Sequence, residues 1–364
     1  MYIRTLKLTN FRNFNQKQIS LENKNFIYGK NGTGKTNILE ALYLVCTGKS
    51  FRAQHNHDYI KNDEVQAAVF VQIEEDKKTK KMQQSLDLQK LNSEKVKKRF
   101  FKNSKKVSIV DFIGNFPVIV FAPEELRMVW GTPKDHRAII DLFIAQNEPK
   151  HALRLLKFSQ IIRQRNKLLF VVGLGKAKAE ELEFWNHELV SAGSEIILLR
   201  NRYISKINKY INDQYQDISQ TKDRLNIKID STINQAINGS NNMQEIKKLY
   251  KQKVLYSAQN DIKLGYTGHG PHRDDIKIYL NQKDISCFGS RGEGKTAVIA
   301  LKFCQKKILK ATHKNNCLFL MDDVFSELDK SRGEYLYKNL SDEQIVFTST
   351  ALHPKAEKFN LIKL

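Results

Sequence analysis

The sequence predicts an α/β protein whose main domain is assembled from both ends of the chain, with a helical lobe inserted between them. Three observations support this prediction. A glycine-rich loop joins a short strand to a helix at residues 29–36. A very apolar strand at 317–321 runs into two aspartates. The residues between these segments have mainly helical spacing, so the expected divisions are 1–125, 126–261 and 262–364.

The N-terminal part shows strand patterns around one strong helix pattern. Residues 2–9 alternate apolar and polar side chains, and 25–28 form a second apolar run. Residues 36–45 then carry apolar side chains at helical spacing. Further strands are expected at 65–73, 84–91 and 116–121, where short apolar runs are bounded by polar residues.

The rest of the chain is helical first and strand-like later. From about residue 135 to 215 the pattern is helical, with a break at the glycines of 173–175. Residues 225–242 are polar and weakly patterned, and 243–259 are helical again. Strand character returns after residue 265, most clearly at 317–321 and 344–348.

Composition narrows the class of protein. The 364 residues are 41% hydrophobic and 27% charged, which is typical of a globular chain. No apolar run approaches the roughly 18 residues that a membrane span needs, and the N-terminus lacks the pattern of a secretory signal. The four cysteines are far apart and indicate neither disulfides nor a metal site. We therefore expect a cytoplasmic protein without a membrane partner.

The charge balance is strongly basic, since 61 Lys and Arg against 39 Asp and Glu give a formal net charge of +22. Such an excess favours a polyanionic partner, of which nucleic acid is the commonest in the cytosol. The alternative is that the many lysines reflect genome base composition. A basic run at 95–106 contains Phe100 and Phe101. It fits either phosphate contacts combined with base stacking, or a solvated hairpin.

The loop at residues 29–36 matches the pattern G-x-x-x-x-G-K-[S/T], which binds nucleotide phosphates. Its glycines let backbone N–H groups close around phosphate oxygens, and the following helix adds its positive N-terminus. Lys35 is expected to neutralise the β- and γ-phosphates of ATP, and the Thr36 hydroxyl to bind Mg²⁺. The expected ATP-binding residues are Gly29, Lys30, Asn31, Gly32, Thr33, Gly34, Lys35 and Thr36.

A nucleotide site of this kind needs acids on a second strand, and Asp322 and Asp323 directly follow the strand at 317–321. Asp322 is expected to hold Mg²⁺ with Thr36, usually through a coordinated water. Asp323 is expected to orient the attacking water or accept its proton. Asp323 and Lys35 are therefore the predicted catalytic residues.

Two further segments indicate the class of nucleotide site. Residues 290–295 read Ser-Arg-Gly-Glu-Gly-Lys before a helical stretch, and 325–329 read Phe-Ser-Glu-Leu-Asp just after the acid pair. Their order and spacing resemble the signature motif and D-loop of ABC-type ATPases, in which the signature of one subunit contacts ATP on the other. Ser290 and Gly292 are thus expected to bind nucleotide. Residues 289–296 also match a second phosphate loop formally, but no convincing strand precedes them.

Several longer segments resemble the RecF family of bacterial DNA replication and repair proteins, from one end of the chain to the other. Pro-His-Arg-Asp-Asp at 271–275 and Asp-Asp-Val-Phe-Ser-Glu-Leu-Asp at 322–329 are the most specific. The other matching segments are 8–14, 29–41, 48–52, 121–126 and 165–169.

The resemblance implies an ABC-type phosphate-loop ATPase head that forms an ATP-dependent homodimer on DNA at single-strand gaps. It implies slow hydrolysis that acts as a switch, which fits Asp323 being one methylene shorter than the glutamate common in fast ABC enzymes. It also implies cooperation with RecR and RecO, and indirectly with RecA, whose loading the protein would assist. The expected location is the cytoplasm, at the nucleoid.

The sequence also departs from the family pattern and leaves alternatives. Glu293 stands where the family often has glutamine, and His136-Arg137 stand where it commonly has two arginines. A transporter ATPase would share the motifs, but the charge and Thr348-Ser349-Thr350, at the position of the transporter histidine, count against it. An SMC-like protein would need a long coiled coil, which is missing. Residues 272–275 could suggest a nuclease, but adjacent residues cannot all face one ion, so we expect a structural or coupling role.

Overall fold

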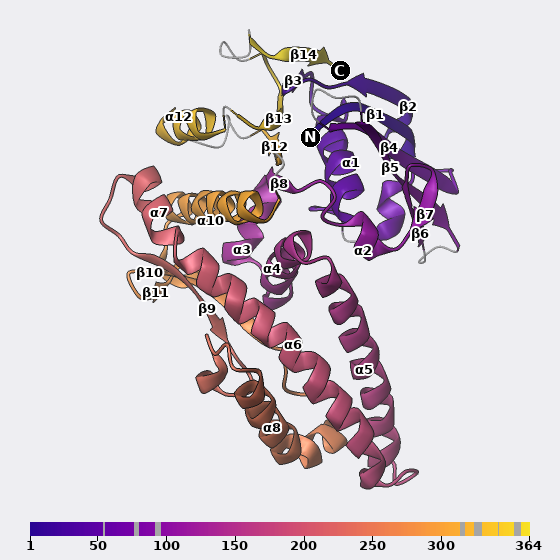
Figure 1. The fold of residues 1–364 in the computed structure, drawn as a ribbon, viewed down its shortest axis with the longest axis vertical. Coiled ribbons are helices and arrows are strands. Elements are labelled where there is room, and N and C mark those ends of the chain that lie inside the picture. Colours follow the sequence, from indigo (N-terminus) through magenta and orange to yellow (C-terminus); the bar gives the residue numbers. More distant parts are fainter. Residues whose placement is uncertain are drawn as a thin grey trace. The chain divides into compact units, whose positions relative to one another are not determined.

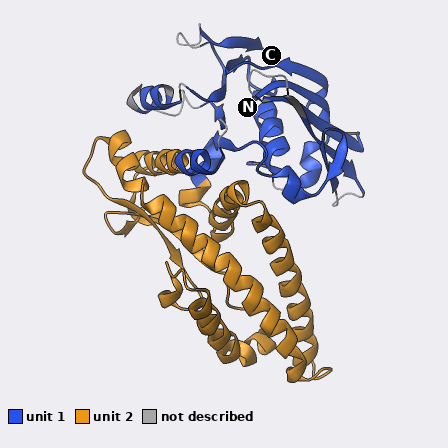
Figure 2. Ribbon diagram, in the orientation of Figure 1, with its two compact units in different colours: residues 1–126, 305–364 blue, residues 127–304 orange. Residues whose placement is uncertain are grey.

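The structure is a computed structural model, and it describes residues 1–53, 55–75, 80–91, 96–313, 317–323, 330–340, 342–352 and 358–364. It divides into two compact units (Figure 2). Unit 1 comprises Met1–Leu126 and Gln305–Leu364, and unit 2 comprises Arg127–Cys304. Unit 1 therefore combines the two ends of the chain, as the sequence predicts.

Unit 1 contains a six-stranded antiparallel sheet in the order β2-β1-β4-β5-β6-β7 (Figure 1). Its strands are β1 (Tyr2–Phe11), β2 (Phe14–Ser20), β4 (Gln66–Glu75), β5 (Lys80–Lys90), β6 (Val96–Lys102) and β7 (Lys105–Val107). One face is apolar and fully buried, for example at Leu6, Val69 and Leu86. The opposite face is polar, which is the usual alternation of a sheet with one solvated side.

The second sheet of unit 1 is parallel and has the order β14-β3-β13-β12-β8. Its strands are β3 (Lys24–Tyr28), β8 (Val118–Phe121), β12 (Leu318–Asp322), β13 (Gln344–Ser349) and β14 (Asn360–Lys363). Helix α1 (Lys35–Thr47) contacts strands of both sheets. The buried Gln344 amide joins the two chain ends, because it bonds Ile3 N at 2.8 Å and Ile3 O at 2.7 Å. The unit also holds α2 (Ile109–Phe112) and α12 (Lys330–Asn339).

Unit 2 is mainly helical. Its helices are α3 (Arg127–Trp130), α4 (Pro133–Asn147), α5 (Lys150–Gly173), α6 (Leu182–Asn208), α7 (Ile211–Ser219), α8 (Met243–Leu264) and α9 (Ile285–Phe288); α10 (Arg291–Thr312) continues into unit 1. Helices α5, α6 and α8 enclose an apolar core that includes Phe158, Leu189 and Tyr250. Short 3₁₀ helices lie at Ala179–Glu181 and Gln235–Ile237 in this unit, and at Asn56–Tyr59 and Pro123–Leu126 in unit 1.

A small antiparallel sheet, β11-β10-β9, also belongs to unit 2. Its strands are β9 (Leu225–Asp230), β10 (Asp275–Leu280) and β11 (Lys283–Asp284). Strand β9 lies in the stretch that the sequence shows as weakly patterned. Because β10 pairs with β9 from Asp275↔Asp230 to Leu280↔Leu225, the residues after 261 fold with the helices. The structure therefore divides at residues 304–305, whereas the sequence analysis placed this boundary at 261–262.

No helix in the described part of the chain is long and apolar enough to cross a membrane.

Candidate nucleotide-binding site

The loop at residues 29–36 joins β3 to α1, which is the strand–loop–helix arrangement that the motif requires. Gly34, the N-cap of α1, has φ 101°, in the left-handed region that favours glycine. A Cβ at this residue would lie 2.6 Å from Phe14 Cζ and 2.8 Å from the Asn13 amide. An alanine at this position would therefore be strained in its backbone and would displace the side chains of Asn13 and Phe14 in the turn between β1 and β2.

Lys35 places its ammonium group at the centre of this loop. Its Nζ donates hydrogen bonds to Gly29 O at 2.7 Å and Lys30 O at 2.9 Å. Thr33 Oγ1 donates to the same Lys30 carbonyl at 2.9 Å. The loop therefore closes around a cation at the N-terminus of α1, and both features attract an anion.

Asp322, the last residue of β12, meets the start of α1. Its Oδ1 accepts hydrogen bonds from Thr36 Oγ1 at 3.0 Å and from Thr348 Oγ1 at 2.7 Å. Burial raises the pKa of this carboxyl group, against the two hydroxyl donors. The structure thus brings together two residues that are 286 positions apart. In the sequence, Thr348-Ser349-Thr350 indicates only a departure from transporter ATPases, and no local pattern predicts the contact of Thr348 with Asp322.

The donor set beside α1 suits Mg²⁺. Thr36 and Asp322 offer hydroxyl and carboxylate oxygens, the ligands that this hard cation prefers. The described residues contain no group of three or more His, Cys, Asp or Glu that could hold a metal. That is compatible with Mg²⁺, which is commonly bound through one or two carboxylates together with the phosphates of its nucleotide.

Asp323 follows β12 in a left-handed backbone conformation, with φ 48°. Its N–H donates to Thr348 Oγ1 at 3.1 Å, so the same threonine hydroxyl contacts both aspartates. This places Asp323 next to Asp322 at the carboxyl end of the parallel sheet. The predicted D-loop, residues 325–329, lies outside the described residues.

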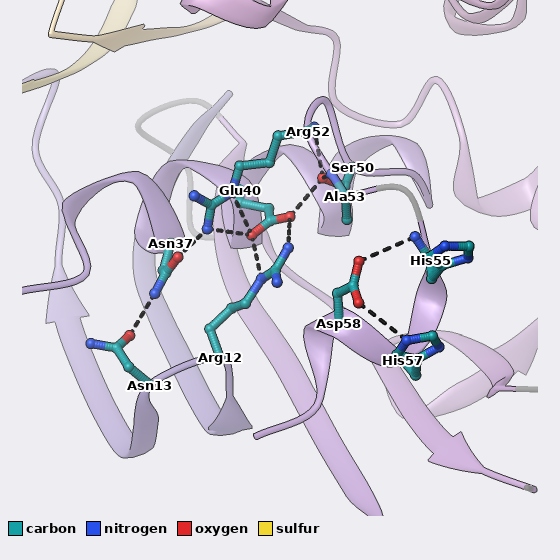
Figure 3. A network of polar contacts seen from close by, with 10 residues as sticks. All are labelled: Arg12, Asn13, Asn37, Glu40, Ser50, Arg52, Ala53, His55, His57 and Asp58. Carbon is teal, nitrogen blue, oxygen red and sulfur yellow. Dashed lines mark hydrogen bonds and ion pairs between the residues drawn. The ribbon is translucent and has the colours of Figure 1, made fainter. Parts of the chain in front are cut away.

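Two arginines surround one buried glutamate of α1, the helix that follows the loop (Figure 3). Glu40 of α1 is fully buried and accepts two hydrogen bonds from Arg12, at 2.8 and 2.7 Å. Arg52 donates to it at 3.0 and 3.1 Å, and Ser50 Oγ at 2.6 Å. Burial by itself would raise the pKa of Glu40, but the bonds from Arg12 and Ser50 and the charges of both arginines lower it.

This network reaches the phosphate loop through two asparagines. Asn37 Nδ2 donates to Asn13 Oδ1 at 2.6 Å, and Asn13 Nδ2 donates to Thr33 O at 3.3 Å. Arg52 also bonds Asn37 Oδ1. Apart from Thr33, these residues have no individual role predicted from the sequence, although they lie in the segments 8–14, 37–41 and 48–52 that carry the family resemblance.

Ser290 and Gly292, the predicted signature residues, lie in unit 2 at the start of α10. Ser290 N–H donates to Glu293 Oε2 at 2.6 Å, and Glu293 N–H donates to Ser290 Oγ at 3.2 Å. This reciprocal arrangement is a capping box, and it places the Glu293 carboxylate at the helix N-terminus. The helix α9, and not a strand, precedes the segment 289–296. The segment therefore lacks the strand–loop–helix arrangement of a phosphate loop.

The polar side chains of the segment 272–275 bond to other residues of unit 2. His272 Nε2 lies 3.1 Å from Thr267 O, and Asp274 Oδ1 accepts from Thr232 N at 2.8 Å. Asp275 Oδ1 lies 2.7 Å from Nδ1 of the buried His136. These side chains point to different partners within unit 2 and do not converge on one point.

Comparisons with known proteins agree with this architecture. A family model described as the RecF/RecN/SMC N terminal domain matches residues 2–358. The DNA replication and repair protein RecF of Alkaliphilus oremlandii is 31% identical over 354 residues, with 97% of this chain and 94% of the relative covered. The RecF of Halothermothrix orenii is 34% identical over 338 residues, with 92% and 88% covered.

Solved structures show the same fold. The structure described as the recombination mediator protein RecF-ATP in the RecFOR pathway has a TM-score of 0.89 at 27% identity, and the match covers 97% of this chain and 93% of the other. An Smc head domain from Pyrococcus furiosus has a TM-score of 0.50 at 17% identity and supports the fold alone.

The fold, with its phosphate loop on one strand and its acid on another, defines a mixed α/β ATPase head of the SMC and RecF type. Within that class, the nearly full-length matches make the assignment specific: the chain belongs to the RecF family.

Proposed function

We propose that this chain is an ATP-dependent DNA-binding clamp of recombinational repair and replication restart. The observation that carries the proposal is the contact of Thr36 with Asp322 beside the closed loop that holds Lys35. This contact supports the proposal because it brings the proposed phosphate-binding loop and the proposed metal-binding acid side by side, as nucleotide hydrolysis requires. The RecF-ATP description of the solved relative supports ATP as the nucleotide.

The roles of the residues follow from their positions. Backbone N–H groups of residues 29–36 would surround the phosphates, with Lys35 neutralising their charge. Thr36 and Asp322 would hold Mg²⁺. When bound, Mg²⁺ would supply positive charge that stabilises the transferred phosphoryl group. Asp323 would orient the attacking water or accept its proton, and its short side chain would make turnover slow, so that hydrolysis serves as a switch.

The clamp would form when two copies share ATP. Ser290 and Gly292 of one copy would contact the nucleotide on the loop of the other. The excess of basic residues, +22 overall, would favour DNA with single-strand gaps as the ligand. The relatives' names support action in DNA replication and repair, and the RecFOR description supports RecO and RecR as partners. With these partners, the protein would help to load RecA at the nucleoid.

Sedimentation of the full-length chain with gapped DNA, with ATP and without nucleotide, tests this function. Wild type should form a DNA-bound dimer only with ATP, and Lys35→Met should remain monomeric because the phosphates lose their cation. Lys209→Met is the matched control, since it removes the same charge from an exposed residue of unit 2.

DNA binding that is equal with and without ATP would overturn the ATP-gated clamp and leave a basic DNA-binding protein. Binding to DNA by neither wild type nor the control would overturn the choice of DNA as the ligand.

A further inference from the structure

The antiparallel sheet of unit 1 divides the described part of the basic run, residues 96–106, between two faces. Lys98 and Phe100 point inward: Lys98 Nζ donates to Gly48 O at 3.0 Å, and the Phe100 ring centroid lies 4.7 Å from that of Phe112. Because side chains alternate along a strand, Lys97, Arg99 and Phe101 of β6 lie on the other face. We call this polar side, opposite the buried leucines and valines, the outer face of the sheet.

One row of side chains crosses the outer face from β1 to β7. The strand register pairs Lys7 with Phe70, Phe70 with Ser85, Ser85 with Phe101, and Phe101 with Lys106. Two partly exposed aromatic rings therefore flank a small serine, with an exposed lysine at each end. The two phenylalanines are two strand spacings apart, roughly 10 Å. Lys7 Nζ lies 5.8 Å from the centroid of the Phe70 ring.

The neighbouring row leaves a hollow beside these rings. It pairs Thr9 with Ala68, Ala68 with Asp87, and Asp87 with Arg99. A cavity of about 260 Å³ opens here, lined by these residues together with Gln66 and Gln89. Arg99 donates to Gln89 Oε1 at 2.8 Å, so hydrogen-bonding groups of both kinds line the hollow.

The charge of these rows is positive. Lys7, Arg99 and Lys106 lie in these two rows, and Lys97 in the next, against one acid in the same rows, Asp87. Glu74 lies on the same face nearer the end of β4, where it pairs with Arg4 at 2.5 Å. Aromatic rings on a sheet surface, flanked by cations, are the elements with which sheet proteins bind single-stranded nucleic acid. The surface of an apolar protein partner could not pair with the cations or with the polar groups of the hollow.

We propose that the outer face of this antiparallel sheet binds single-stranded DNA. Bases stack on Phe70 and Phe101, while Lys7 and Lys106 contact the phosphates on either side. The hollow around Asp87, Gln89 and Arg99 receives polar base edges. The inference rests on the proposed function in taking DNA as the ligand, but it needs neither ATP nor a dimer.

Anisotropy titrations of a labelled oligothymidylate and of a labelled duplex, without nucleotide, test the proposal. Phe70→Ala with Phe101→Ala should weaken binding of the single strand by roughly 30-fold or more, because two base-stacking contacts are lost. Duplex affinity should change little, since paired bases are not available to the rings. Phe101→Trp should retain binding of the single strand. Tyr256→Ala removes an aromatic side chain that is 87% exposed in unit 2, and is the matched control.

The two lysines have a separate readout. Lys7→Gln with Lys106→Gln should reduce the slope of log affinity against log salt by about 1.4 for the single strand, since each phosphate contact contributes about 0.7. The Lys209→Met control should leave this slope unchanged.

Several outcomes would overturn the proposal. One is unchanged single-strand affinity in the phenylalanine variants while wild type still forms its ATP-dependent dimer on gapped DNA. Equal loss of single-strand and duplex affinity would also overturn it, because stacking would not explain that loss. If the variants show the predicted selective loss but ATP has no effect on wild type, the inference stands and the ATP-gated clamp fails.

Discussion

At the scale of single residues, alanine substitutions at Gly32 and Gly34 distinguish the cost of backbone strain in the phosphate loop from the cost of steric crowding. Both have positive φ, 82° and 101°, but a Cβ at Gly32 would meet nothing within 4 Å. Alanine at either position costs about 1–2 kcal/mol of backbone strain. Gly34→Ala also forces Asn13 and Phe14 aside, and should weaken ATP binding at least 10-fold more than Gly32→Ala does. Titration with a fluorescent ATP analogue measures the difference, and equal losses would contradict the crowding argument.

Glu293 offers a second prediction at this scale. Its carboxylate accepts from Ser290 N–H and brings negative charge to the segment proposed to approach the partner copy's ATP. Glu293→Gln keeps an acceptor for that bond and removes the charge. The ATP-dependent dimer should become about 2- to 5-fold tighter, as expected for a charge at a helix terminus.

Sedimentation equilibrium with ATP measures this effect. Glu183→Gln, in the first turn of α6, is the matched control for loss of an acid at a helix start. A dimer that is weaker in Glu293→Gln than in wild type would show that the carboxylate helps engagement.

Because His272 is largely buried, we expect it to make the folding stability of the protein depend on pH. Burial lowers its pKa to about 4, and the charges of Arg273, Arg137 and Arg165 act in the same direction, against its bond to Thr267 O. Between pH 6.5 and 4 the unfolded chain binds a proton that the folded chain does not. This contribution to stability is therefore full above pH 6.5 and is lost as the pH falls, by about 3 kcal/mol at most. Urea unfolding at pH 7.5 and pH 5 should show a smaller loss for His272→Gln than for wild type, and an equal loss would contradict the assignment.

At the scale of elements, one buried acid joins three helices of unit 2. Asp141 of α4 accepts from Arg200 of α6 at 2.9 and 2.8 Å, and its Oδ1 lies 3.1 Å from His151 Nε2 of α5. Burial would raise the pKa of Asp141, but Arg200 and His151 outweigh it and hold that pKa well below its usual range. Arg200 Nη1 also donates to Pro271 O at 2.6 Å, which links these helices to the segment 271–275.

Breaking this pair should therefore destabilise the helical unit. Arg200→Met leaves a buried carboxylate without its cation and should cost about 3–5 kcal/mol of unfolding free energy. Asp141→Leu combined with Arg200→Met should recover most of that loss. Urea unfolding measures both. Arg202→Met is the control, since its nearest carboxylate contact is an exposed one at 4.0 Å, worth at most about 1 kcal/mol. A double variant as unstable as the single one would contradict the pairing argument.

At the scale of the whole molecule, the net charge of +22 predicts a strong dependence of DNA binding on salt. If the protein neutralises several phosphates, affinity for gapped DNA should fall by about 10³-fold or more between 50 and 200 mM salt. ATP binding to the isolated chain should change much less over the same range. Anisotropy titrations at several salt concentrations measure both, and a flat DNA curve would show that the basic excess has another cause.

The locally determined features of this protein could be predicted from its sequence. Strand β1, the unit β3–loop–α1, and β12 with its two acids follow from patterns within short segments, because periodicity and loop chemistry act over a few residues. Strands β2 and β9 were missed. The outward side chains of β2 are polar, and β9 was hidden within a polar stretch until its pairing with β10 gave its alternating isoleucines a face to bury.

The features that only the tertiary structure decided depend on contacts between distant segments. Thr36 reaches Asp322, and Arg12 and Arg52 meet on Glu40, because separate strands and loops end beside α1. No pattern within a short segment predicts which residues from distant segments will contact one another there. Likewise Phe100 and Phe101 are adjacent in sequence, and only the pairing of β6 in the sheet decides that Phe100 packs inward against Phe112 while Phe101 lies on the outer face. Local chemistry thus sets what each segment can form, whereas packing decides which side chains meet.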